Sequence, residues 1–270
     1  PPLPSPDDPM TRSLYTAASG MKAQQFLVDT SANNIANVNT SGFKKSRLSF
    51  RSLLYQTYRE PGLPLANNQN DVTGLQIGSG TEVSGSRKIM LQGVLELTGN
   101  ALDLGIEGEG FFEVALPNGE LRYTRNGTFR SDSNGRLVTA EGYLLTDQVT
   151  IPQDSQGISV SADGQVFSLG DQNVQNAIGT IRLHVFPNAT GLRAMGSNYF
   201  APTASSGQPA ALQPGVQAAG TVRQSYLERS NVETVDELVS LIVAQRNYEV
   251  NSRAIRVSDE MLQQVNQLVR

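Results

Sequence analysis

Both ends of the chain carry apolar residues at a seven-residue spacing. In residues 11–39 the repeat falls on Leu14, Met21, Val28 and Ile35, with Ala18, Gln25 and Ala32 in a companion column. From about Val235 onward it falls on Leu241, Tyr248, Ile255 and Leu262. This spacing is typical of helices that pack together along a seam. We therefore predict a long, coiled-coil-forming helix at each end of the chain.

The C-terminal helix is expected to be apolar on two sides. A second column, Val243, Val250 and Val257, lies two residues from the first, which is about 200° around a helix. A single partner cannot cover both sides. A helical hairpin within one chain, or two separate core helices, would explain one side only. We expect the other to bind further copies. We also expect both ends to be poorly ordered in the isolated subunit and to become ordered only in the polymer.

The middle of the chain has the pattern of antiparallel β structure. From about Val72 to Tyr226, short apolar runs are separated by turn dipeptides that favour hairpins. These dipeptides are Asn118-Gly119, Asn126-Gly127, Asn134-Gly135 and Asp163-Gly164. Their spacing predicts a meander of short strands, and the Ala-, Ser- and Gly-rich residues 201–220 predict a loop. The fold class is therefore α+β, with terminal helices flanking a β-rich domain.

These patterns divide the chain into five parts. The proline-rich residues 1–9 predict a disordered lead-in, either native or left from the expression vector. Residues 10–43 form the N-terminal helical segment, 44–71 a connection, 72–225 the β-rich outer domain and 226–270 the C-terminal helical segment.

Composition excludes several kinds of function. With no cysteine and one histidine, the chain lacks the residues for disulfide frameworks, thiolate nucleophiles and cysteine or histidine metal clusters. A formal charge of -4 gives no basic footprint for nucleic acid. No apolar run spans a bilayer, and no secretory signal is apparent. We predict no enzyme activity, no cofactor, no nucleic-acid partner and no membrane insertion.

Four local features suggest chemistry but have simpler explanations. Gly105, Gly108 and Gly110 precede a strand pattern instead of opening a helix, which indicates a turn and not a phosphate loop. Paired carboxylates could hydrolyse glycans, although alternation along a strand predicts a solvated edge. The carboxylates are Glu107, Glu109 and Glu113. His184 is expected to be a packed histidine, and the basic cluster Lys44, Lys45, Arg47 and Arg51 a solvated or subunit-contacting face.

One thirteen-residue segment carries a family resemblance. Residues 32–44, ANNIANVNTSGFK, resemble the basal-body rod signature of the axial proteins of the bacterial flagellum, which include rod, hook and hook-associated subunits. The signature residues are Asn33, Asn34, Asn37, Gly42 and Phe43. Because Gly42 tolerates a left-handed backbone, we expect it to end the helix. We expect Ser230 or Asn231 to cap the approach to the second helix.

Further similarity to this family runs through the rest of the chain. It includes GEGFF at 108–112, YTRNGTF at 123–129, ERSNV at 228–232 and QRNYE at 245–249. Ser225 stands where many members have glycine. Residues 53–62 and 74–80, LLYQTYREPG and GLQIGSG, are similar to the branch that builds the distal rod. A proximal rod or hook-type subunit is the alternative within the family.

The resemblance implies a structural subunit of the flagellar basal body. Such a chain would polymerise helically with itself into a drive shaft that crosses the periplasm and encloses an export channel. Proximal rod subunits, hook subunits and the surrounding bearing-ring proteins would be its partners. Export would use the flagellar type III apparatus, without a cleaved signal peptide. A cell-wall glycan-binding or hydrolysing protein, or an adhesin with helical stalks, is the alternative outside the family.

Overall fold

The computed structural model describes residues 9–60, 74–147, 149–170 and 175–268, which separate into two compact units. The helix–hairpin unit lies within Pro1–Ile35, Ser46–Arg87 and Thr234–Arg270. The β unit comprises Ala36–Lys45 and Lys88–Glu233. A helix near each end and a β-rich antiparallel domain between them confirm the predicted α+β class. Most of the expected lead-in, residues 1–8, lies outside the described residues.

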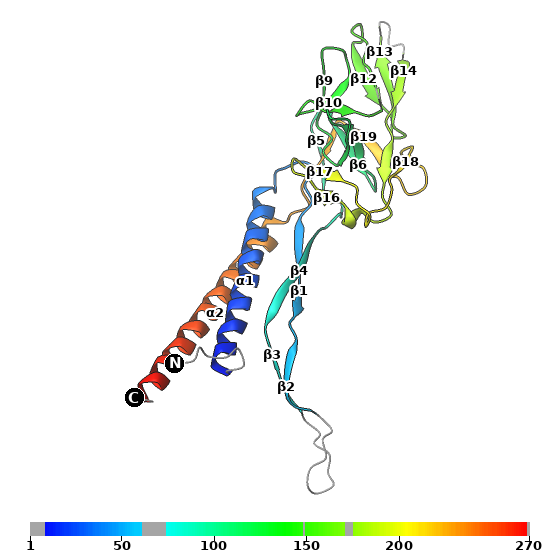
Figure 1. The fold of residues 1–270 in the computed structure, drawn as a ribbon. Helices are drawn as coiled ribbons and strands as arrows, with labels where there is room; N and C mark the ends of the chain where they lie inside the picture. Colours follow the sequence, from blue (N-terminus) through cyan, green and yellow to red (C-terminus); the bar gives the residue numbers. More distant parts are fainter. Residues whose placement is uncertain (1–8, 61–73, 148, 171–174, 269–270) are drawn as a thin grey trace. The chain divides into compact units, whose positions relative to one another are not determined.

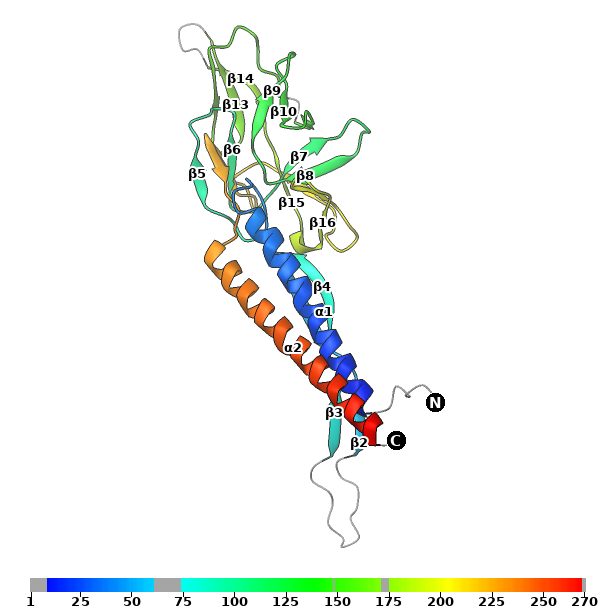
Figure 2. The same cartoon turned by 90° about the vertical axis from the view of Figure 1, so that its left-hand side faces the viewer.

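The two helices lie side by side and run in opposite directions (Figures 1 and 2). Helix α1 spans Pro9–Ala36 and α2 spans Thr234–Leu268, beginning one residue from the predicted start. The helices approach closely at small residues: a Cβ added to Gly20 would lie 2.9 Å from Nδ2 of Asn251. The hydroxyls of Ser13 and Ser258 are 3.2 Å apart. Small residues at the contact let the two backbones come together.

A long β-hairpin completes the helix–hairpin unit. Strands β1 (Ser46–Ser52) and β4 (Thr81–Lys88) pair, and β2 (Tyr55–Arg59) pairs with β3 (Leu75–Gly78). The amide of Thr81 donates to the hydroxyl of Ser19 at 3.3 Å, which fixes the hairpin to α1. Within residues 44–71, taken from the sequence as a connection, the described part contains β1 and β2.

The β unit consists of many short strands, and every pairing between them is antiparallel where its direction is described. The first ten strands are β5 (Leu95–Leu97), β6 (Leu104–Glu107), β7 (Phe112–Ala115), β8 (Leu121–Thr124), β9 (Phe129–Ser131), β10 (Leu137–Thr139), β11 (Leu144–Leu145), β12 (Gly157–Val160), β13 (Gln165–Leu169) and β14 (Gln175–Thr180). They are followed by β15 (Leu183–Val185), the 3-10 turn η2 (Ala189–Gly191), β16 (Arg193–Ala194), β17 (Tyr199–Ala201), β18 (Ala210–Leu212), β19 (Thr221–Gln224) and β20 (Tyr226–Glu228).

The largest sheet has the order β16-β17-β8-β7-β11-β10-β9, so it is only partly a meander. Strands β9, β10 and β11 follow one another, but β8 and β9 are not neighbours. The turn at Asn126-Gly127 therefore joins unpaired strands, contrary to the hairpin predicted there. Its glycine is needed for another reason, because a Cβ on Gly127 would lie 1.7 Å from the carbonyl oxygen of Leu104.

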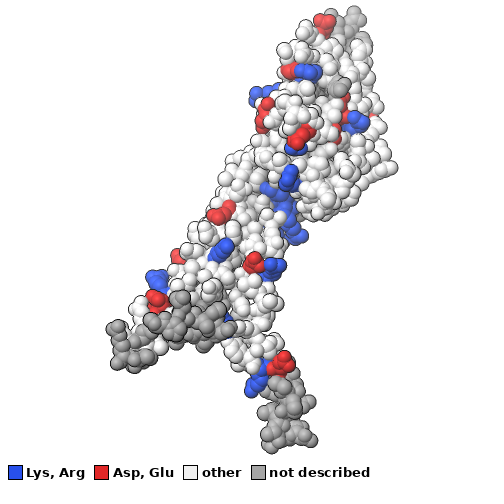
Figure 3. Space-filling view, in the orientation of Figure 1, with Lys and Arg blue, Asp and Glu red and all other residues white. Residues whose placement is uncertain are grey.

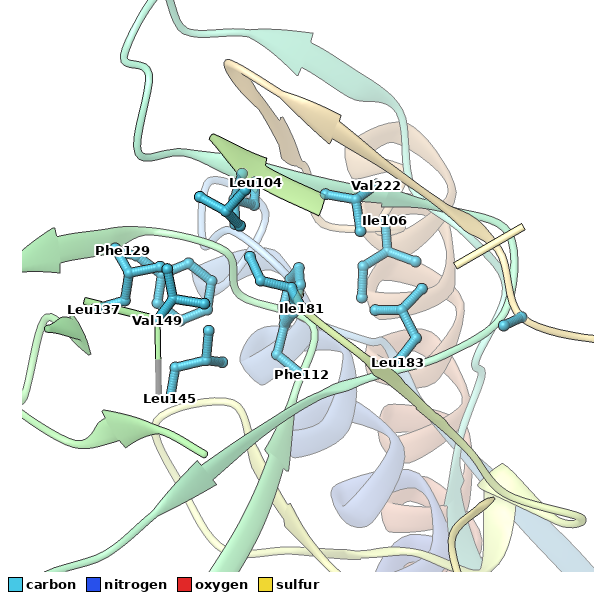
Figure 4. Close-up of a cluster of buried hydrophobic side chains, with 12 residues drawn as sticks. Leu104, Ile106, Phe112, Phe129, Leu137, Leu145, Val149, Ile181, Leu183 and Val222 are labelled. Carbon is cyan, nitrogen blue, oxygen red and sulfur yellow. The ribbon is translucent and has the colours of Figure 1, made fainter. Parts of the chain in front are cut away.

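The larger of two apolar clusters holds much of the β unit together. Its side chains come from strands far apart in sequence, including Ile106, Phe112, Phe129 and Ile181, and they point toward one another in Figure 4. The rings of Phe112 and Phe129 meet edge to face, with centroids 5.2 Å apart. Burial of each such side chain contributes about 1.5–3 kcal/mol. The cluster gives the unit a core of its own.

Residues 201–220 are not simply the loop predicted from their composition. Strand β18 lies within them and pairs with β15, and Ser206 is fully buried. Its hydroxyl accepts from the amide of Thr203 and donates to the carbonyl of that residue. Pairing with a distant strand overrides the weak local preference of an Ala- and Ser-rich segment.

Candidate subunit-assembly site

The predicted seam residues of α2 lie on the side that faces α1. Asn251 and Ser258 contact α1, and by helical spacing Leu241, Ile255 and Leu262 share their side of the helix. These three leucine and isoleucine side chains are half-buried, while Tyr248 is 43% exposed. On α1, the predicted residues Leu14, Met21, Val28 and Ile35 are also half-buried. Pairing within the chain thus covers one side of α2 only in part.

A second side of α2, about 200° around the helix from the Leu241 column and about 100° from Asn251 and Ser258, is apolar and exposed. The second column predicted from the sequence, Val243, Val250 and Val257, is 49%, 58% and 53% exposed. Further exposed apolar residues precede it in the first two turns and extend it at the far end. They are Val235, Leu238, Val239, Ile242, Met261 and Val265. Exposed apolar surface of this extent usually marks an interaction site.

The four residues of the first two turns were not among the predicted site residues. Val235, Leu238, Val239 and Ile242 follow the i, i+3, i+4, i+7 spacing of an amphipathic helix. The seven-residue repeat selects Leu241 in this part of the helix. The same residues also contain the second apolar pattern, in which apolar side chains are more closely spaced. A search for both spacings would have found it.

The asparagines of the family signature fix the end of α1. Asn34 is buried, and its side chain accepts from the amide of Ser46 at 2.9 Å and donates to the carbonyl of Ser46 at 3.0 Å. This paired contact holds the first residue of β1 against the helix. Asn37 accepts from the hydroxyl of Thr40 at 3.2 Å, while Asn33 is exposed on the helix surface.

Gly42 does not end the helix, contrary to the sequence prediction. Helix α1 ends at Ala36, and Gly42 lies six residues later with a φ of 70°. A Cβ there would lie 2.6 Å from the amide nitrogen of Asn126, and the Gly42 amide donates to the carbonyl of Glu228 at 2.8 Å. Glycine is required because two backbone segments of the β unit meet at this point. Phe43 beside it is buried, with the Lys88 ammonium 4.4 Å from its ring centroid.

A buried ionic cluster joins the signature segment to the start of the C-terminal segment. Nζ of Lys44 lies 2.5 Å from Oε1 of Glu228, and Nη1 of Arg125 lies 3.3 Å from Oε2. The Lys44 and Glu228 side chains are 1% and 0% exposed. The amide of Gly93 also donates to Glu228, at 2.8 Å, and Lys44 donates to the carbonyl of Leu91 at 2.7 Å. We call Lys44, Arg125 and Glu228 the buried junction.

Lys44 therefore does not belong to a solvated basic face, as its sequence neighbours suggested. Burial lowers the pKa of Lys44 and of Arg125, and the Glu228 carboxylate opposes this by favouring both charged forms. Arg51, from the same sequence cluster, is exposed and pairs with Glu82 at 2.7 Å. Sequence proximity could not reveal that one lysine turns inward to meet a carboxylate 184 residues away.

Asn231 braces the junction instead of capping α2. Its side-chain oxygen accepts from the amide of Lys45 at 2.8 Å, and its Nδ2 donates to the carbonyls of Ile89 and Leu91. The Ile89 amide in turn donates to the carbonyl of Lys45 at 2.9 Å. Three segments of the chain are thus tied together where the β unit begins and ends.

The three carboxylates considered for glycan hydrolysis do not form one solvated edge. Glu107 is exposed and pairs with Arg223 at 2.6 Å, and Glu109 is exposed. Glu113, in contrast, is buried and accepts from the hydroxyl of Tyr123 at 2.9 Å. Since β6 ends before the glycine turn, the alternation of a single strand does not continue to Glu113. A carboxylate enclosed in this way has no access to a glycan.

His184 is packed in the β unit, as predicted, and it has an acidic neighbour from another strand. Its Nδ1 lies 2.9 Å from Oε2 of Glu113. Burial lowers the pKa of His184, while the negative charges of Glu113 and Asp147 oppose that shift. The predicted glycine turn is also present, with Gly108 and Gly110 at positive φ between β6 and β7.

The described residues show few features of a catalytic or membrane site. Within them, no three His, Asp or Glu side chains gather as metal ligands would, and neither helix contains a stretch apolar enough to cross a membrane. On the face drawn in Figure 3, charged side chains of both signs lie in small groups among uncharged residues. The exposed side of α2 is the candidate functional surface.

Comparison with known families matches three separate regions of the chain. Residues 14–44 match the family described as flagella basal body rod protein. Residues 105–168 match the flagellar hook protein FlgE/F/G D1 domain, and residues 223–268 match the flagellar basal body rod FlgEFG protein C-terminal family. These regions contain the helix α1 signature, much of the β unit and all of α2.

Several curated proteins are similar over nearly the whole chain. The flagellar basal-body rod protein FlgG of Borreliella burgdorferi is 45% identical over 97% of this chain and 100% of its own length. That of Caulobacter vibrioides is 44% identical over 95% and 99%. The flagellar hook protein FlgE of Helicobacter mustelae is 43% identical, but over only 50% of this chain and 30% of its own length.

Proposed function

Because the chain belongs to the family of flagellar basal-body rod proteins, which are structural subunits, we propose that it polymerises with copies of itself into the distal rod. The similarity of residues 53–62 and 74–80 to the distal branch supports this position. So does the contrast between full-length similarity to rod proteins and partial similarity to a hook protein. The polymer would transmit motor torque to the hook and enclose the export channel.

The observation that carries the proposal is the exposed apolar side of α2. Val250 and Val257 are more than half exposed in the centre of a helix whose other side already contacts α1. Burying such a side chain contributes about 1.5–3 kcal/mol, so a copy that covered several of them would bind favourably. A polymer built from heterologous contacts offers every copy such a neighbour.

The polymer would have an inner tube built from the paired terminal helices of many copies, and we assign the packing of this tube to both sides of the helix pair. Leu14, Met21, Val28 and Ile35 of α1 would pack with Leu241, Tyr248, Ile255 and Leu262 of α2 in coiled-coil fashion. The outer column of valines would bind neighbouring copies. Helices packed on two sides resist bending, which suits a rigid shaft.

The remaining partners and the location follow from the same family membership. Proximal rod subunits would contact one end of the polymer and hook subunits the other, with bearing-ring proteins around it. The rod would cross the periplasm after type III export of its subunits.

A substitution on the outer side of α2 tests the proposal directly. Val257→Asp would place a charge in the subunit contact, where an unpaired charge costs several kcal/mol, on the order of 3–5. We expect the purified variant to stay monomeric in sedimentation under conditions that polymerise the unchanged chain. The β unit should keep its circular dichroism spectrum, since Val257 lies in the other unit.

A matched variant separates the site from a general effect of charge. Gln245→Asp adds the same charge to an exposed position of the same helix, away from the valine column. We expect it to polymerise normally. Equal assembly of Val257→Asp and Gln245→Asp would contradict the proposal.

A further inference from the structure

The outward side of α1 carries two opposite charges one heptad apart. Lys22 and Asp29 are exposed and lie roughly opposite Ser13 and Gly20, the residues that contact α2. Seven residues of helix separate the charges by about 10 Å along the axis.

The outward side of α2 carries the same spacing with the signs exchanged. Arg253 and Glu260 are exposed and lie about 200° around the helix from Asn251 and Ser258, the residues that contact α1. In the part of the chain that the structure describes, neither these two charges nor Lys22 and Asp29 form an ion pair.

The two outward sides match when the helices run in opposite directions. Setting Lys22 opposite Glu260 also sets Asp29 opposite Arg253. The same alignment places small Ala32 opposite Val250 and Gln25 opposite Val257, the two valines in the centre of the exposed column. Two charge pairs, the apolar contact of Ala32 with Val250 and the contact of Gln25 with Val257 thus fall into one register.

This match cannot form within one chain. There, Gly20 is level with Asn251 and Ser13 with Ser258, so the two outward sides point away from each other. Copies that stand side by side in the same orientation, however, bring α1 of one against α2 of the next in opposite directions, because the helices are antiparallel in every copy.

We propose that α1 of one copy docks on the outward side of α2 of the next, pairing Lys22 with Glu260 and Asp29 with Arg253. This inference rests on the proposed self-assembly and specifies its contact. The two surfaces differ, so each copy keeps one of each kind free for a further neighbour. Such a heterologous contact extends into an open polymer instead of closing as a dimer does.

The register also fixes how far neighbouring copies are displaced along the helix axis. Along the helix axis, Arg253 lies level with Ala18 of its own chain. In the proposed contact it lies level with Asp29 of the neighbouring copy. The difference of eleven residues corresponds to about 16 Å. An image of the polymer that resolves the helices should show this displacement between laterally adjacent copies.

Charge reversal tests the pairing. Lys22→Glu and Glu260→Lys should each raise the critical concentration for polymerisation by about tenfold, equivalent to about 1.4 kcal/mol. Combining both in one chain should return it to within about threefold of the unchanged protein, because the ion pair re-forms with exchanged signs. Lys22→Glu combined with Asp259→Lys, which lies off the outward side, should not recover.

Engineered cysteines give an independent readout, since the chain has none of its own. A chain with Gln25→Cys mixed with a chain carrying Val257→Cys should form a disulfide-linked dimer of the two only after polymerisation. Cross-linking of Val257→Cys chains to one another alone would overturn the proposal, as would absence of rescue by the double charge reversal.

These experiments distinguish the register of the contact from the proposed self-assembly. A polymer that Val257→Asp blocks, but that shows no charge rescue and no mixed cross-link, refutes the register and leaves the proposed function standing. If the unchanged chain does not polymerise under any condition, both fail.

Discussion

The substitution Glu228→Gln should strongly destabilise the β unit. It removes the carboxylate that pairs with both Lys44 and Arg125, all three being buried. Breaking a buried ion pair by removing one partner typically costs about 3–5 kcal/mol, because the remaining charge stays away from water. Here two cations would remain, so we expect a loss near the upper end of that range. Urea unfolding followed by circular dichroism measures it.

An exposed ion pair provides the control for this experiment. Arg51 and Glu82 pair at 2.7 Å, but their side chains are 65% and 50% exposed. Water screens such a pair, and Glu82→Gln should cost about 0–1 kcal/mol. If Glu228→Gln costs no more than Glu82→Gln, the buried junction does not have the energetic role that its geometry indicates.

The pH dependence of the variant gives a second check. Burial lowers the pKa of Lys44 and Glu228 opposes this, so the substitution should lower that pKa further. In the unfolded chain the pKa of a lysine is about 10.4. Between the lowered folded-state pKa and the unfolded-state pKa, the unfolded state binds more protons, so the stability of the variant should rise as pH increases toward the unfolded-state pKa. Adding Lys44→Met should remove this rise and restore part of the loss.

Three further predictions concern the backbone and the histidine. Ser225→Gly should stabilise the chain by about 0.5–1 kcal/mol in urea unfolding, because Ser225 has a φ of 64°, where glycine is unstrained; a loss of stability would contradict this. Gly80→Ala should release the hairpin from α1, seen as faster proteolysis of the hairpin, since its Cβ would lie 2.2 Å from the Ser19 hydroxyl. Gly142→Ala, with a similar φ and open space, controls for backbone strain alone. Burial lowers the pKa of His184 below its usual 6.5, so between the folded and unfolded pKa values the unfolded chain binds more protons. Stability should therefore fall as pH drops below about 6.5. His184→Gln should flatten this dependence of stability on pH.

The order of the terminal helices in the free subunit is still to be measured. The sequence predicts that they are poorly ordered in the isolated subunit and become ordered only in the polymer, and the exposed side of α2 gives a physical reason. Hydrogen exchange on dilute monomer would measure it. Strong protection of residues 241–262 there would contradict the prediction.

The sequence alone determined the elements whose signals are local. A heptad repeat and a pair of apolar columns are properties of one helix, so α2 and its two apolar sides could be predicted from residues 235–270. The α+β class, the packed His184 and the glycine turn before Phe111 also followed from short-range patterns. The family resemblance was readable for the same reason, because a thirteen-residue segment carries it.

Only the tertiary structure decided which distant residues meet. Lys44 was assigned to a solvated face because its sequence neighbours are basic, yet its partner is Glu228, at the other end of the chain. Gly42 was assigned to a helix end, but its backbone conformation is set by contact with Asn126. Pairing and burial between distant segments depend on the three-dimensional path of the chain. The energy of a buried charge or of a close backbone contact therefore arises only in the folded protein.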